Sequence, residues 1–153
     1  MADSGAIRVR PVREEDREGW AKLRWALFPD FDPPEIDEFF AHGGFPGFQH
    51  SAVFVAEAEG ALVGFAEATA RPYAEGCETT PVAYLEGWYV DEAWRRHGVG
   101  AKLAAAVAAW GRDLGMKEFA SDASPENSVS REAHKALGFE EIEQIVCFAK
   151  KLE

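Results

Sequence analysis

The chain has 153 residues, of which 47% are hydrophobic and 28% charged, a composition typical of a globular protein rather than of a disordered or fibrous chain. Its 16 Lys and Arg against 27 Asp and Glu give a formal net charge of −11, which disfavours nucleic acid and anionic membranes as partners and favours cations. The longest strictly apolar run, residues 103–110, is far shorter than the ~18 residues that a membrane span requires.

Apolar periodicity predicts an α/β chain with strands and helices interspersed. Apolar and charged residues alternate from Ile7 to Arg10, as in a half-buried strand, and Trp20, Leu23 and Leu27 then recur at helical spacing. Val99, Leu103, Val107, Trp110 and Leu114 form the clearest helical stripe of the chain. In chain order we expect a strand over 7–10, helices over 14–28 and 35–41, strands over 52–57, 62–70 and 83–90, a helix over 98–114, a strand over 118–123, a helix over 128–137 and a strand over 139–150.

This order of elements indicates a mixed sheet. The early strands follow one another closely, as in an antiparallel meander, whereas the strand–helix–strand unit of the second half requires a parallel pair. The sequence has no internal repeat, low-complexity tract or dividing linker, so we expect one domain over residues 1–153.

A basic, glycine-bearing loop lies between the strand over 83–90 and the long helix. Arg95, Arg96 and His97 precede Gly98 and Gly100, which open the helix. Glycines let the free N–H groups of a helix start approach an anion closely, and the helix dipole favours negative charge there. The loop is therefore a candidate phosphate site, although the glycines could instead only cap a turn beside solvated arginines.

The motif Arg95-x-x-Gly98-x-Gly100 resembles that of the GNAT superfamily of acetyl-coenzyme A-dependent N-acetyltransferases. A second resemblance lies in Asn127-x-x-Ser130-x-x-x-His134-x-x-x-Gly138-Phe139, where the family commonly has Tyr in place of His134. The resemblance implies the GNAT fold, a central mixed and mostly antiparallel sheet with helices on both faces. It also implies acetyl-CoA bound by Trp88, Tyr89, Val90, Arg95, Arg96, His97, Gly98, Val99, Gly100, Ala101 and Asn127.

A closer similarity is to the aminoglycoside 6'-N-acetyltransferases, in particular the small homodimeric enzymes of chromosomal bacterial type. It is carried by the segments 27–29, 73–81, 85–90, 121–127 and 134–139. Phe28 departs from the Trp that this subgroup leads us to expect, and Trp binds cations over its face better than Phe does. By resemblance the aminoglycoside is bound by Phe28, Tyr73, Glu86, Asp122 and Glu143, the last of which could serve the site of a partner subunit.

Acetyl transfer to an amine requires a neutral nucleophile, a stabilised oxyanion and a neutralised thiolate. If the strands that carry Glu86 and Asp122 are parallel neighbours, both carboxylates project near one cleft, where Glu86 could accept the amine proton. Both could instead face only water, and Glu143 could belong to a solvated edge. By resemblance the N–H of Val90 stabilises the oxyanion.

His134 is a candidate general acid because its reference pKa of about 6.5 suits protonation of a thiolate. It could also hydrogen-bond the sulfur or pack as a neutral helix residue. Cys77 has no evident base nearby in sequence, so we expect direct attack in a ternary complex without a covalent enzyme intermediate.

The resulting hypothesis is a cytoplasmic, homodimeric enzyme that acetylates the 6'-amine of aminoglycosides with acetyl-CoA. Two cysteines are too few for a disulfide framework, and the N-terminus lacks the apolar stretch of a secretory signal, so we expect a cytoplasmic location. His42 and His50 have no metal-ligand spacing, so we expect no metal. The acidic surface would also suit another polyamine or a protein amine, and could simply keep the protein soluble. A non-catalytic CoA-binding sensor is the alternative from another class.

Overall fold

The computed structural model describes residues 6–30 and 34–153. Residues 1–5 and 31–33, which include the expected signal-free N-terminus and part of the expected break after the first helix, lie outside the described residues. The chain divides into two compact units, Met1–Asp122 and Ala123–Glu153, and each is described by itself. That one domain spans residues 1–153 stays a prediction.

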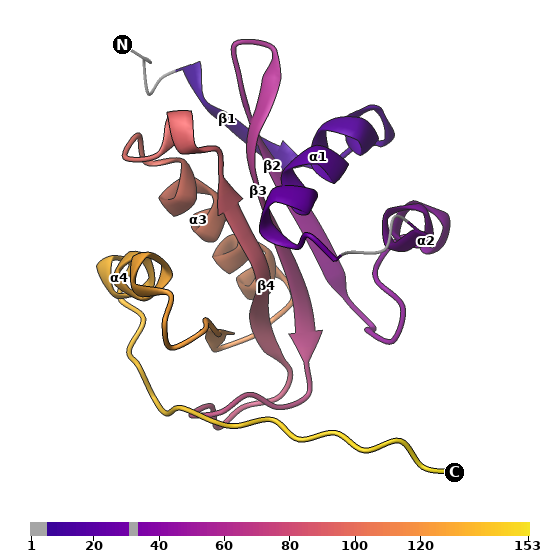
Figure 1. The fold of residues 1–153 in the computed structure, drawn as a ribbon, viewed down its shortest axis with the longest axis vertical. Coiled ribbons are helices and arrows are strands. Elements are labelled where there is room, and N and C mark those ends of the chain that lie inside the picture. The colour runs from indigo at the N-terminus through magenta and orange to yellow at the C-terminus, as the bar shows by residue number, and fades with distance from the viewer. Residues whose placement is uncertain (1–5, 31–33) are drawn as a thin grey trace. The chain divides into compact units, whose positions relative to one another are not determined.

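The first unit is built on a mixed sheet (Figure 1). Within the described residues the sheet has five strands in the order β1-β2-β3-β4-β5; all neighbours are antiparallel except the parallel pair β4–β5. Both the meander and the parallel pair predicted from the sequence are confirmed. The strands are β1 (Arg8–Pro11), β2 (Ser51–Ala58), β3 (Ala61–Arg71), β4 (Val82–Val90) and β5 (Phe119–Ser121), and the helices are α1 (Arg17–Leu27), α2 (Pro34–His42) and α3 (Val99–Asp113), with single turns of 3₁₀ helix at Glu14–Asp16 and Glu92–Trp94.

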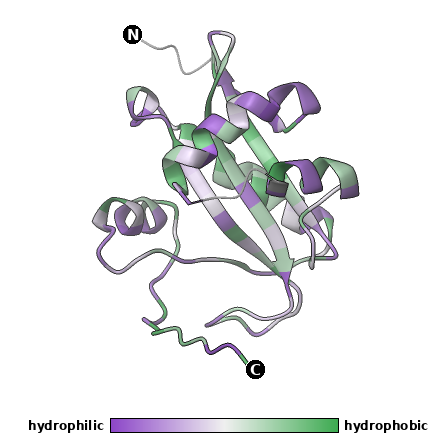
Figure 2. Cartoon of the chain, turned by 45° about the vertical axis from the view of Figure 1, so that its right-hand side comes forward, coloured by the Kyte–Doolittle hydropathy of each residue, from purple (hydrophilic) through white to green (hydrophobic). Residues whose placement is uncertain are grey.

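Helices cover both faces of this sheet, as expected (Figure 1). Successive residues of a strand point to opposite faces, so β2 supplies Ala56 and Ala58 to one core and Val53 and Val55 to the other. The first core packs against α3, and the second packs against α1 and α2. Figure 2 shows hydrophobic residues along the strands between these two layers.

The long helix α3 buries the stripe that its sequence predicts. Val99, Leu103 and Val107 are at most 1% exposed. Leu114, expected as the last member of the stripe, is instead the C-cap and is 45% exposed, because the chain leaves the helix at that point. Gly98 precedes the helix with a φ of 78°, a left-handed conformation that glycine adopts without steric cost.

An ion-pair cluster ties β1 to β2 and to the turn before α1. The Arg10 guanidinium donates to both Asp16 oxygens at 2.6 and 2.9 Å and to Glu57 at 2.8 Å, and Asp16 also accepts from the Arg13 N–H at 2.7 Å. Hydrogen bonds from Arg10 hold the pKa of Asp16 below its ordinary value. A carboxyl whose pKa is lower in the folded than in the unfolded chain stabilises the fold above the unfolded pKa, and this stabilisation is lost as the pH falls.

Asp16→Asn is therefore expected to lower the free energy of unfolding by about 2–3 kcal/mol at pH 7, because Arg10 loses the more buried of its two charged partners and keeps only Glu57. The difference from wild type should shrink below about pH 4, where Asp16 of the unfolded wild type takes up protons while the folded carboxyl still resists them. Urea unfolding at pH 7 and pH 3.5 measures both values. Asp37→Asn is the matched control, since Asp37 pairs with Arg17 at the surface and should contribute at most about 1 kcal/mol. An equal Asp16→Asn effect at both pH values would contradict this account.

A second ion pair lies inside the core between α1 and β3. Arg24 donates to both oxygens of Glu67 at 2.7 and 3.1 Å, and the Trp20 indole N–H donates to Glu67 at 3.0 Å. The side chains of Arg24 and Glu67 are 8% and 3% exposed. Burial raises the pKa of Glu67, while Arg24 favours its charged form.

The second unit contains α4 (Ser128–Ala136), close to the predicted bounds. Asn127 caps it by accepting from the Ser130 N–H at 3.0 Å, and Gly138 follows the helix with a φ of 92°. The strand predicted over 139–150 is wrong, because these residues form neither strand nor helix. Their alternating apolar pattern suits a strand, but a strand needs a backbone partner, and the apolar side chains here are exposed: Ile142, Ile145, Val146 and Phe148.

Candidate active site

Strand β4 leads directly into the predicted phosphate loop. Asp91 caps the turn Glu92–Trp94 by accepting from the Ala93 N–H, and Arg96 and Gly98 both have positive φ, 67° and 78°. The first helical bond of α3 runs from the Lys102 N–H to the Gly98 carbonyl. The N–H groups of residues 99–101 therefore precede the helical bonding pattern, which leaves them suited to an anion at the positive end of the helix dipole.

The side chains of the loop are partly engaged in holding it. Arg95 Nε donates to the Val90 carbonyl at 3.1 Å, and its guanidinium lies 5.7 Å from the centre of the Tyr89 ring. His97 Nδ1 lies 2.8 Å from the Arg95 carbonyl oxygen, so it donates to that oxygen. Both side chains thereby fix the path of the backbone between β4 and α3.

The Trp88 side chain packs against the first turn of α3. Its indole N–H donates to the Gly100 carbonyl at 3.0 Å, and a Cβ added at Gly100 would lie 3.1 Å from the Trp88 ring. The motif thus needs a residue without a side chain at this position because of close packing as well as anion access.

Gly100→Val is expected to weaken acetyl-CoA binding at least about tenfold, because a branched side chain must displace the Trp88 ring and with it the helix start. Titration calorimetry with acetyl-CoA measures the change. Ala105→Val places the same side chain at an exposed position of α3 and should bind acetyl-CoA like wild type. Equal affinities of Gly100→Val and Ala105→Val would contradict the assignment.

Glu86 stands at an irregularity in β4. In the pairing with β3, Glu67 is opposite Gly87 and Ala68 is opposite Leu85, so Glu86 is the extra residue of a β-bulge. Its carboxylate accepts from the Thr69 hydroxyl at 2.6 Å and from Arg71 at 2.8 and 2.6 Å. A bulge re-aims a side chain, and here Glu86 lies at an open pocket of about 350 Å³. The pocket is lined by Arg24, Glu35, Glu38, Phe45, Pro46, Phe48, Glu67, Thr69 and Glu86.

Phe28 lies next to this part of β4. A Cβ added at Gly87 would be 3.2 Å from the Phe28 ring, and the Arg24 guanidinium lies 5.6 Å from the ring centre. Phe28 also lines a second open pocket of about 420 Å³, which shares Arg24 and Glu35 with the first. Tyr73, in the loop after β3, is 66% exposed.

Glu86 and Asp122 belong to one polar network. Asp122 accepts from the Tyr84 hydroxyl at 2.6 Å, and the guanidinium of Arg71, the partner of Glu86, lies 3.6 Å from the centre of the Tyr84 ring. Strand β4, which carries Glu86, and β5, which Asp122 directly follows, are parallel neighbours, as expected. Arg71, Tyr84 and the other pocket carboxylates, Glu35, Glu38 and Glu67, were not predicted from the sequence.

The amide of Val90 points away from β3. Val90 pairs with Gly64, whereas the next residue, Asp91, donates its N–H to the Val63 carbonyl at 2.8 Å. Hydrogen-bonding direction alternates along an antiparallel strand, so the Val90 N–H is directed to the other side of β4. On that side the pairing with β5 ends at Leu85. The geometry is therefore compatible with an N–H available to a ligand.

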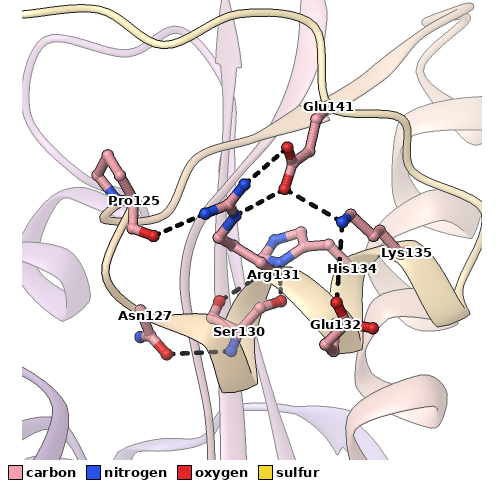
Figure 3. Close-up of polar contacts among 8 residues, drawn as sticks. All are labelled: Pro125, Asn127, Ser130, Arg131, Glu132, His134, Lys135 and Glu141. Atoms are coloured by element: carbon pink, nitrogen blue, oxygen red, sulfur yellow. Dashed lines mark hydrogen bonds and ion pairs between the residues drawn. The ribbon is translucent and has the colours of Figure 1, made fainter.

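Asn127, His134 and Glu143 lie in the second unit. His134 Nδ1 is 2.7 Å from the Ser130 carbonyl oxygen (Figure 3). The His134 ring meets the Phe139 ring edge-on, with 5.3 Å between the ring centres. A carbonyl only accepts, so Nδ1 carries a proton and Nε2 of a neutral ring is an acceptor. Glu143 is exposed in the segment after α4.

Arg131 organises the second unit around α4. It donates to the Pro125 carbonyl at 2.8 Å and to both oxygens of Glu141 at 2.7 and 2.9 Å (Figure 3). These hydrogen bonds lower the pKa of Glu141 to about 2. The start of the unit and the segment after α4 are thereby attached to the same helix.

Other chemistry finds less support among the described residues. Burial, with Glu118 nearby, raises the pKa of the Cys77 thiol, which disfavours the nucleophilic thiolate. Residues 6–30 and 34–153 contain no group of three or more His, Cys, Asp and Glu side chains placed to hold a metal ion. No helix in the same residues has the length and apolar character needed to cross a bilayer.

The fold, the loop at the start of α3 and the pocket beside β4 define an acyl-CoA-type acetyltransferase, and the chain belongs to the Acetyltransferase (GNAT) family, whose sequence profile matches residues 18–139. Aminoglycoside N(6')-acetyltransferase type 1 of Stenotrophomonas maltophilia is 44% identical over 98% of this chain and 97% of its own length. The protein of the same name from Klebsiella aerogenes is 44% identical over 94% of this chain and 96% of its own.

The chain is also similar to solved structures of aminoglycoside 6'-N-acetyltransferases. AAC(6')-Iy in complex with the bisubstrate analogue CoA-S-monomethyl-acetylneamine has a TM-score of 0.87 and 37% identity, over 95% of this chain and 99% of that one. AAC(6')-Ih from Acinetobacter baumannii has a TM-score of 0.85 and 32% identity, over 96% and 99% of the two chains. The predicted GNAT fold and the similarity to aminoglycoside 6'-N-acetyltransferases are thus confirmed.

Proposed function

We propose that this chain transfers the acetyl group of acetyl-CoA to the 6'-amine of aminoglycosides and thereby confers resistance to them. The observation that carries the proposal is that one strand, β4, supplies Glu86 to a pocket lined by carboxylates and leads through the loop 91–98 to the N-terminus of α3. An amine and a thioester can meet only if their sites adjoin, and a shared strand provides this. The relatives at 44% identity support the choice of acceptor.

The acidic character of the chain suits a polycationic acceptor. Glu35, Glu38 and Glu86 line the same pocket, and the net charge of −11 would steer ammonium groups towards it. Phe28 and Tyr73 would supply ring surface to the sugar, and Asp122 a second anionic contact. We assign the acceptor site to these residues.

In the proposed mechanism the pyrophosphate of acetyl-CoA binds at the N–H groups of residues 99–101, with Arg96 adding positive charge. Glu86, directly or through a water molecule, takes a proton from the substrate ammonium, and the freed amine attacks the thioester carbonyl. The C–N bond forms and the Val90 N–H stabilises the oxyanion. The C–S bond then breaks, the nitrogen loses its second proton, and the departing thiolate takes up a proton to leave as CoA. No covalent enzyme intermediate is needed.

For the second unit we propose that Asn127 contacts the pantetheine arm and that His134 acts near the thiolate. Since His134 Nδ1 donates to Ser130, only Nε2 can face the sulfur, and it can donate a proton only from the imidazolium form. His134→Gln keeps hydrogen-bonding capacity without this acid function. We expect it to lower kcat about tenfold or more with a small change in KM.

We further propose a homodimer in the cytoplasm. The segment 139–153 exposes Ile142, Val146 and Phe148, which a second copy could cover, and Glu143 would then serve the partner's site. Light scattering after size exclusion should give twice the chain mass, and Phe148→Asp should give a monomer; a monomeric wild type would contradict this part. The use of acetyl-CoA and the free thiols Cys77 and Cys147 support a cytoplasmic location.

Release of free thiol from acetyl-CoA tests the proposal, with two aminoglycosides that differ only in an amine or a hydroxyl at 6'. We expect rapid release with the amine and little with the hydroxyl. Release with a linear polyamine but with neither aminoglycoside would favour another acceptor. Tight acetyl-CoA binding without release on any amine would favour a sensor.

A further inference from the structure

The two acceptor carboxylates are connected by two residues of β3 and β4 that do not belong to the assigned acceptor site. Arg71, at the end of β3, binds Glu86, and Tyr84, on β4, binds Asp122. The guanidinium of Arg71 lies 3.6 Å from the centre of the Tyr84 ring. A continuous path of charge-assisted and cation–π contacts therefore joins one carboxylate to the other.

Glu86 is restrained in orientation as well as neutralised in part. Nε of Arg71 donates to one carboxylate oxygen and a terminal nitrogen to the other, and a planar fork of this kind fixes the plane of the carboxylate. The Thr69 hydroxyl takes a third acceptor position at 2.6 Å. A carboxylate offers about four acceptor positions, so essentially one direction is left for an incoming ammonium group.

Asp122, unlike Glu86, is exposed, and without the Tyr84 hydroxyl its carboxylate would rotate freely. The Tyr84 hydroxyl holds it at 2.6 Å from a ring that is only 3% exposed. Burial raises the pKa of Tyr84, so the hydroxyl stays a proton donor. The buried ring thus gives the exposed carboxylate a fixed anchor.

We propose that Arg71 and Tyr84 are positioning residues of the acceptor site, which set the direction of Glu86 and hold Glu86 and Asp122 at a fixed separation. The inference rests on the proposed function and deepens it. Two anionic groups at fixed separation suit a rigid polyamine, whose ammonium groups are also fixed, better than a flexible one, because a rigid ligand loses less conformational entropy on binding.

A double-mutant cycle tests the proposal for Tyr84. Tyr84→Phe keeps the ring beneath Arg71 and removes only the hydroxyl, so it should raise KM for a 6'-amino aminoglycoside about tenfold with little change in kcat. In an Asp122→Asn background the same change should have less than about a twofold effect, because the group that the hydroxyl holds has lost its charge. Equal effects of Tyr84→Phe in both backgrounds would overturn the role of Tyr84.

Arg71 is tested by graded replacement. Arg71→Met should lower kcat about tenfold or more through misorientation of Glu86, and Arg71→Lys, which keeps the charge but not the fork, should recover only part of it. Arg10→Lys is the matched control, since Arg10 makes a similar forked ion pair between β1 and β2 outside the pocket. Wild-type kinetics for Arg71→Met would overturn its role.

Aminoglycoside binding by calorimetry, in all variants, provides a readout besides turnover. A wild type that neither binds nor acetylates any aminoglycoside overturns the proposed function, and this inference with it. An active wild type, with additive Tyr84 and Asp122 effects and wild-type kinetics for Arg71→Met, overturns the inference alone.

Discussion

Glu86→Gln is expected to lower kcat/KM for a 6'-amino aminoglycoside by about 10²–10³-fold, the range typical of losing a general base. Gln keeps the shape of the side chain and can still accept from Thr69, but it has no charge for the ammonium group and cannot take its proton. Affinity for acetyl-CoA should stay within about twofold of wild type, because no part of the loop at the start of α3 is altered. Steady-state thiol release and calorimetry measure the two quantities.

The matched control for this variant is Glu57→Gln, which removes a carboxylate that also pairs with an arginine of a neighbouring strand. It lies on β2, outside the pocket, and should leave kcat/KM unchanged. Asp122→Asn should act in the same direction as Glu86→Gln but mainly through KM. Unchanged turnover in both Glu86→Gln and Asp122→Asn would remove the acceptor-site assignment.

The largest effect on stability is expected for Arg24→Met, which leaves the Glu67 carboxylate buried without its cation. The expected loss is about 3–5 kcal/mol of the free energy of unfolding at pH 7. Removal of Arg24 raises the pKa of Glu67 further than burial already does. A carboxyl with a raised pKa in the fold favours the fold at low pH and opposes it as the pH rises, so the loss should be smaller at pH 5 than at pH 8.

A double variant separates this effect from loss of packing. Arg24→Met with Glu67→Gln removes both charges and keeps an acceptor for the Trp20 indole N–H. Urea unfolding should show that it recovers most of the loss. A double variant less stable than Arg24→Met, or a loss below about 1 kcal/mol in Arg24→Met, would contradict the account.

Local patterns were sufficient to predict most of the fold. The stripe of Val99, Leu103 and Val107 predicts the helix because those residues pack on one face of the sheet. Alternation along β2 likewise reflects two cores, one on each side. The prediction of a strand over 139–150 was wrong, because an alternating apolar pattern does not by itself provide the neighbouring strand with which the backbone must pair.

The part of the candidate site that is contiguous in sequence could be predicted, whereas contacts between residues on different strands could not. The loop 95–101 is contiguous, and its glycines and arginines are visible as a motif. Arg71 and Tyr84 were missed because their relation to Glu86 depends on register. The bulge shifts the pairing by one residue between Glu67 and Ala68, and no local pattern of the sequence marks that shift.

The position of the acetyl group on the product shows directly whether the chain is a 6'-N-acetyltransferase. An aminoglycoside with several amines is treated with enzyme and ¹³C-acetyl-CoA, and heteronuclear NMR then assigns the nitrogen that carries the label. We expect one singly acetylated product with the label on the 6' nitrogen. A label on another amine, a mixture of isomers or an ester would contradict it.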